Sequence, residues 1–153
     1  MAAVKRIAAL RRDQSGAELI EFALVFPLLL LAMLGMFDFG LLFERYQVVT
    51  NAAREGARVA VLPGYADGDV EARVNQYLTA GGLTDTPTIT VGASESIKIG
   101  GECISVRPVT VAYPHSFSFV GTLMTALGSS GFTSTTVQAT AAMRNEVPAG
   151  GCP

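Results

Sequence analysis

Residues 22–37 read FALVFPLLLLAMLGMF, a run without a single charged side chain. After Asp38 the apolar character resumes at Phe39 and continues to Phe43. The whole run covers about 22 residues, and a helix of that length rises about 33 Å at about 1.5 Å per residue. That length is sufficient to cross the hydrocarbon core of a membrane. The sequence therefore predicts one transmembrane helix, which we assign to residues 17–43.

The charges on either side of this run predict its orientation. Lys5, Arg6, Arg11 and Arg12 precede it against a single Asp13, whereas acidic and basic residues alternate after it. Because basic flanks stay on the cytoplasmic side, the N-terminus is expected in the cytoplasm and the remainder of the chain is expected to be exported across the inner membrane.

A cleaved secretory signal peptide is the competing interpretation, since it also begins with basic residues and an apolar run. Signal peptides have a shorter apolar core, however, and their small-residue cleavage site follows that core. Here the small residues Ser15, Gly16 and Ala17 come before the run. The order of the two features therefore favours a retained anchor.

Two carboxylates, Glu18 and Glu21, stand at the start of the apolar helix. They are three residues apart and so share a helix face, and both suit the positive end of the helix dipole. An ionised carboxylate at the edge of hydrocarbon is costly, which makes Glu21 a candidate functional residue. Just before them, Ser15 and Gly16 disfavour helix, and Gly16 lets another molecule approach an extended backbone closely.

The string from Gly16 to Phe22, GAELIEF, resembles a prepilin processing site, in which glycine precedes the cut and glutamate is the fifth residue of the mature chain. The continuation FALVFP at residues 22–27 and the segment NAAREGAR at residues 51–58 are similar to the TadE-like family of tight-adherence pilus assembly proteins. The resemblance covers roughly the first 60 residues.

This resemblance implies a minor pilin or pseudopilin that supports pilus biogenesis, adhesion and biofilm formation. A prepilin peptidase would remove the cytoplasmic leader, residues 1–16, by cutting between Gly16 and Ala17. The partners would then be that peptidase, other pilins, the pilus assembly machinery and the inner membrane. In a bundle of such helices, Glu21 of one subunit could neutralise the new amine of Ala17 on another.

The two cysteines, Cys103 and Cys152, are far apart and have no histidine cluster near them, so their spacing matches no metal or thiol-redox site. Because the domain is expected outside the cytosol, we predict a disulfide between them. This interpretation is simpler than a catalytic pair of Cys103 with His115, the only histidine, which we expect in a loop. The chain is predicted to be no enzyme and to need no cofactor.

Other features of the composition exclude further classes of function. The formal charge of −2 gives no electrostatic basis for binding nucleic acid.

Asp38 could suggest a proton relay within the membrane, but it lies about 25 Å beyond Glu21 by helical rise, where we expect water to reach it.

Residues 44–153 are expected to form one exported α+β domain. An amphipathic helix over residues 46–62 continues from the anchor, its small residues packing on the domain itself, and a second helix covers residues 69–80. Alternating patterns predict an antiparallel meander of four strands, and Arg107 with Pro108 marks either a bulge or a sheet edge. Residues 116–131 are expected to form a short helix that covers the sheet. The predicted strands are residues 88–91, 96–99, 103–113 and 135–143.

A membrane-anchored binding or sensory module that is not polymerised is the alternative function, because only the start of the chain carries the resemblance.

Overall fold

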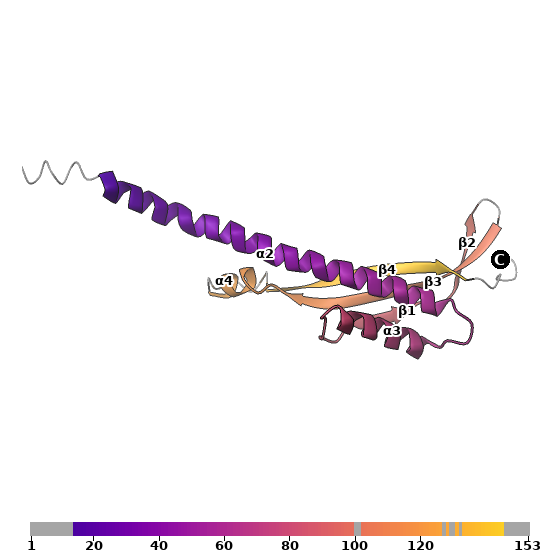
Figure 1. The fold of residues 1–153 in the computed structure, drawn as a ribbon. Helices are drawn as coiled ribbons and strands as arrows, with labels where there is room; N and C mark the ends of the chain where they lie inside the picture. The colour runs from indigo at the N-terminus through magenta and orange to yellow at the C-terminus, as the bar shows by residue number, and fades with distance from the viewer. Residues whose placement is uncertain (1–13, 100–101, 127, 129–130, 132, 146–153) are drawn as a thin grey trace, which may run out of the picture.

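The computed structural model describes residues 14–99, 102–126, 128, 131 and 133–145 of the chain. Its dominant element is a single helix, α2 (Gln14–Ala60), of 47 residues. The predicted anchor and the predicted amphipathic helix are thus two halves of one helix, which passes through Pro27 without ending. The first half projects well beyond the folded domain, and the second half lies along it (Figure 1).

The domain is built on an antiparallel sheet of four strands, β1 (Thr88–Val91), β2 (Glu95–Ile99), β3 (Glu102–Ser116) and β4 (Ser134–Arg144). The long strand β3 is central. Strands β1 and β2 follow one another along one of its edges, and β4 pairs along the other. The predicted α+β class, with a long helix, a short second helix and a small antiparallel sheet, is confirmed.

The strand register contains one bulge, which lies opposite Arg107 and Pro108. Val91 of β1 pairs with Val109, and Glu95 of β2 pairs with Val106. The chain therefore advances four residues from Val91 to Glu95 while β3 advances three. The extra residue therefore belongs to the segment that joins β1 to β2, where Gly92 donates its amide hydrogen to the carbonyl oxygen of Pro108 at 2.8 Å. The alternative of a sheet edge in β3 is wrong, because β3 is paired on both sides.

One face of the sheet is covered by the second half of α2 and by α3 (Asp67–Ala80). Small residues of α2 permit this close packing: a Cβ atom at Gly56 would lie 2.6 Å from Cγ2 of Val74. The prediction that the small residues of this helix pack on its own domain is confirmed. The buried apolar side chains of the two helices and the sheet are Val49, Ala52, Ala53, Ala57, Val59, Ala60, Val70, Val74, Leu78, Val109, Val111, Tyr113, Val137 and Ala139.

Arg107 holds three segments together at the far end of α2. Its guanidinium donates to the carbonyl oxygen of Ala60, the last residue of α2, at 3.1 Å, and to the carboxylate of Asp67, the first residue of α3. Its Nε donates to the carbonyl oxygen of Gly92 in the bulge at 3.2 Å. The bulge thus brings a strand cation to the C-terminal end of α2, where the helix dipole favours positive charge.

The last helix, α4 (Val120–Ala126), occupies the connection between β3 and β4. We expected it to cover the sheet, and this is wrong. Instead α4 packs against α2 beyond the end of the sheet, on the side toward the projecting half of α2 (Figure 1). The reason is that α2 and α3 already occupy the apolar face of the sheet.

Candidate functional site

The segment predicted as a processing site lies at the very beginning of α2. Gly16, Ala17, Glu18 and Glu21 are all exposed and belong to the part of the helix that projects from the domain. The extended backbone expected at Ser15 and Gly16 is absent, because the helix already begins at Gln14. Cleavage by a peptidase that needs an extended substrate would therefore require this part of the helix to unwind.

Gly16 has no role in the fold itself. A Cβ atom built on Gly16 would meet nothing within 4 Å. Its φ angle is not among the positive ones, which in the described residues occur at Gly64, Gly82 and Gly128. Since glycine within a helix is unfavourable by about 0.5–1 kcal/mol relative to alanine, a requirement for glycine at this position would come from another molecule.

The two carboxylates lie along the helix instead of at its beginning. The first turn of α2 contains no acidic residue, so Glu18 and Glu21 are not placed to neutralise the helix dipole as expected. None of the ion pairs of the described part of the chain involves either residue. A cut between Gly16 and Ala17 would move Glu18 into the first turn and leave Glu21 as the fifth residue.

The part of α2 that follows is exposed, and apart from Glu21 its side chains are apolar on all sides. From Leu19 to Phe37 its large side chains are mostly exposed, with exposed fractions as high as 71% at Leu24 and 76% at Met36. This is the one helix of the described residues that is long and apolar enough to cross a membrane. From Ala17 to Phe37 its rise is about 30 Å, the thickness of a hydrocarbon core. The helix therefore suggests membrane anchoring.

Asp38 follows directly after this exposed apolar segment. Our expectation that water reaches its side chain is wrong. The side chain is buried, with 1% exposure. Oδ1 accepts the amide hydrogen of Ser118 at 3.1 Å, and Oδ2 accepts those of Phe119 at 3.0 Å and Val120 at 2.6 Å. Asp38 thus caps the N-terminus of α4 from a distant part of the sequence, and it fixes the end of the β3–β4 hairpin to α2.

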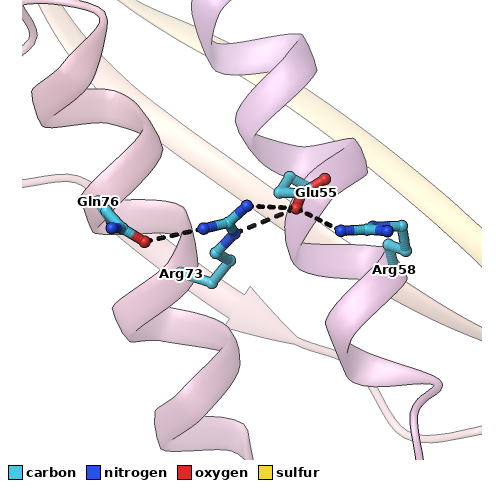
Figure 2. A network of polar contacts seen from close by, with 4 residues as sticks. All are labelled: Glu55, Arg58, Arg73 and Gln76. Carbon is cyan, nitrogen blue, oxygen red and sulfur yellow. Dashed lines mark hydrogen bonds and ion pairs between the residues drawn. The ribbon is translucent and has the colours of Figure 1, made fainter.

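A second polar network joins the NAAREGAR segment of α2 to α3 (Figure 2). Oε1 of Glu55 accepts hydrogen bonds from Arg58 at 2.9 Å and from two nitrogens of Arg73 at 3.1 and 2.7 Å. Arg73 also donates to Gln76 at 2.9 Å. The hydrogen bonds from Arg58 and then Arg73 lower the pKa of Glu55 below its usual value. Ala52, Ala53 and Gly56 of the same segment lie in the core. The residues of NAAREGAR are thus explained by the packing of α2 against α3 and the sheet.

His115 lies in β3 and not in a loop, as we had expected. It is 2% exposed, its ring packs edge-on against Phe117, and neither ring nitrogen has a hydrogen-bond partner. Burial, with a smaller effect of the Arg45 charge, lowers its pKa, and Asp38 opposes this change. Cys103 is in the same strand, about 40 Å away at about 3.3 Å per residue. The pair therefore cannot act as nucleophile and base within one chain.

One of these positions, Asp38, carried a signal in the sequence that our reasoning did not use. Asp38 is the one charged residue inside the apolar run, and the residues that begin α4 include no acidic side chain that could accept their amide hydrogens. The position of Arg107 required knowledge of the bulge.

Fold and site together define a class: a protein with one N-terminal apolar helix, long enough to cross a membrane, that continues directly into a small α+β domain. Residues 16–58 match the family model described as TadE-like protein, so the resemblance to the TadE-like family is confirmed over α2. No curated protein and no solved structure matches the chain significantly. The TadE-like family suggests involvement in tight-adherence pilus assembly, and it is a family of pilus components that is not known as enzymatic.

Replacing Asp38 by alanine should release α4 from α2. Three part-buried amide hydrogens would lose their acceptor, and a fully buried group left unsatisfied costs about 1–3 kcal/mol, so the cost of each amide lies toward the lower end of that range. We expect hydrogen exchange at Ser118, Phe119 and Val120 to accelerate by at least tenfold, while the amides of β3 that pair with β4 stay protected. Asp38→Asn, which keeps one carbonyl oxygen, should give an intermediate rate. Glu44→Ala, an exposed position of the same helix, is the control, and unchanged exchange in Asp38→Ala would contradict the capping role.

Proposed function

We propose that this chain is a minor pilin or pseudopilin that supports the biogenesis of a tight-adherence pilus, and through it adhesion and biofilm formation. The observation that carries the proposal is that the family match and the exposed apolar part of α2 begin at almost the same residue. The TadE-like match begins at Gly16, a glycine that the fold does not need, and the bare apolar helix begins directly after it.

In this proposal residues 1–16 are a cytoplasmic leader, residues 17–43 cross the inner membrane and residues 44–153 form the exported domain. A prepilin peptidase removes the leader, and the mature chain then associates with other pilins and with the assembly machinery. The basic residues before the apolar run support this orientation.

Cleavage between Gly16 and Ala17 is the first consequence to test. Sequencing the N-terminus of the mature protein, from a host that contains the peptidase, should give Ala17 as the first residue. Gly16→Leu should leave the precursor uncut, because a bulky side chain obstructs approach to the backbone, while membrane insertion is unchanged. Gly40 is also on α2 with open space around it, so Gly40→Leu serves as the control that is still cut. A mature chain that keeps Met1 would contradict the proposal.

A disulfide between Cys103 and Cys152 is expected if the domain is exported. Cys103 lies in β3, opposite Lys98 of β2, and Cys152 lies outside the described residues, so the bond stays a prediction. It would contribute about 2–4 kcal/mol by constraining the unfolded chain. Mass spectrometry of unreduced protein from the cell envelope should detect the linked peptides, and two free thiols there would argue against both the bond and the export.

Glu21 would act in assembly by pairing with a second subunit. After the cut, the amine of Ala17 and the carboxylate of Glu21 of one chain are about 6 Å apart along the helix axis. Both groups lie at the membrane edge, where an unpaired charge is costly. In a bundle of helices, the amine of an incoming chain can meet the carboxylate of a chain that is already in place, which would fix the register between them.

Glu21→Gln should therefore separate cleavage from assembly. The variant keeps Gly16 and the apolar helix, so it should be inserted and cut normally. Breaking a buried ion pair costs about 3–5 kcal/mol, so crosslinking to companion pilins should fall by two orders of magnitude or more. Glu44→Gln, an exposed glutamate of α2 beyond the anchor, is the matched control. Normal crosslinking and normal piliation in the Glu21→Gln strain would remove the assembly role.

A further inference from the structure

The tip of the β3–β4 hairpin lies beside the part of α2 that would be inside the membrane. A cavity of about 360 Å³ between the two is lined by Leu31, Gly35, Asp38 and Phe39 of α2 and by Phe117, Val120 and Met124 of the tip. Leu31 precedes Asp38 by seven residues, which corresponds to about 10 Å along the helix. The tip therefore extends about 10 Å along α2 from Asp38 toward the N-terminus of the helix.

The sequence of the tip suits contact with hydrocarbon. From Pro108 to Met143 the chain contains no aspartate, glutamate, lysine or arginine. Phe119 is 45% exposed although it is a large aromatic residue, and Leu123 and Met124 are only partly covered. A free, water-facing tip of a hairpin would normally carry charged or polar side chains.

Several polar groups of the tip are bonded within the protein, which lowers the cost of placing them in a nonaqueous environment. The amide hydrogens that begin α4 are accepted by Asp38. The hydroxyl of Thr122 donates to the carbonyl oxygen of Ser118 at 2.7 Å, and that of Thr125 donates to Gly121 at 2.8 Å. Asp38 itself thereby receives three donors, so its carboxylate can lie at this depth without water.

We propose that α4 and the residues around it, 117–126, are inserted into the outward-facing leaflet of the membrane beside α2, with lipid acyl chains as the partner. The domain would then be held to the bilayer at two places, the anchor helix and this tip. The inference rests on the proposed membrane anchor. It fixes how the domain stands on the membrane, since an anchor alone leaves the domain free to rotate and tilt.

The chain contains no tryptophan, so single tryptophans can report the environment of the full-length protein. Phe119→Trp and Leu123→Trp place the probe on the tip, Phe26→Trp places it in the middle of the anchor, and Tyr65→Trp places it in the exposed loop between α2 and α3. The proteins are reconstituted in vesicles of phosphatidylcholine and phosphatidylglycerol in which acyl chains carry bromine, a contact quencher, either near the headgroup or near the chain end.

Both tip probes should show blue-shifted emission and lose most of it to bromine near the headgroup, with less loss to bromine near the chain end. Phe26→Trp should show the opposite order, and Tyr65→Trp should be quenched by neither. Quenching of Phe26→Trp without quenching of either tip probe would overturn the tip proposal and keep the anchor. Blue-shifted tip probes that no brominated lipid quenches would also overturn it, in favour of contact with another protein. Loss of quenching at Phe26→Trp as well would remove the anchor itself.

Discussion

The whole molecule depends on the continuity of one helix. The first half of α2 is mostly apolar and exposed and meets the domain only at the tip that contains α4, whereas the second half presents small residues such as Ala52 and Gly56 to α3 and the sheet. One continuous helix, with Pro27 inside its first half, joins a half suited to a membrane to a half suited to packing on a water-exposed domain. Because the helix is continuous, the depth of the first half in a membrane would set the height at which the domain stands, while a second contact such as the proposed one at the tip would be needed to fix which way its sheet faces.

Charged side chains bonded to backbone groups secure the domain to this helix at both ends of their contact. Asp38 accepts the first amide hydrogens of α4, and Arg107 donates to the last carbonyl of α2. Each side chain satisfies a helix terminus that its own sequence leaves without a partner. Hydrogen bonds to charged groups stabilise more than neutral ones do, about 1.5–3 kcal/mol each. The Glu55 network between them, which is more exposed, contributes less to stability and more to the alignment of α2 with α3.

The features that could be predicted from the sequence are those that a local pattern determines. The apolar run, the period of the second half of α2 and the alternation in each strand predicted the elements and the fold class, and the motif at Gly16 with the NAAREGAR segment predicted the resemblance to the TadE-like family. What could not be predicted depends on contacts between distant residues. Asp38 and Val120 are 82 positions apart, the bulge belongs to the strand opposite Pro108, and His115 is buried only because Phe117 and α2 come together over it. The helical start at Gln14 was missed because the low helix propensity of Ser15 and Gly16 was given more weight than the strong helix that follows them.

A cut after Gly16 would change the electrostatics of the anchor more than its shape. The leader carries Lys5, Arg6, Arg11 and Arg12 against Asp13, and such a basic segment opposes movement of the helix out of the cytoplasmic face of the membrane. Once it is removed, the end of the helix carries one new amine with Glu18 and Glu21, charges that can neutralise one another or a neighbouring chain. A helix whose end can be neutralised is far less costly to draw into a nonaqueous bundle than one preceded by four cations and a single carboxylate. Under the proposed function, the cut would therefore do more than shorten the chain: it would convert an end that holds the helix in place into one that can be buried against another subunit.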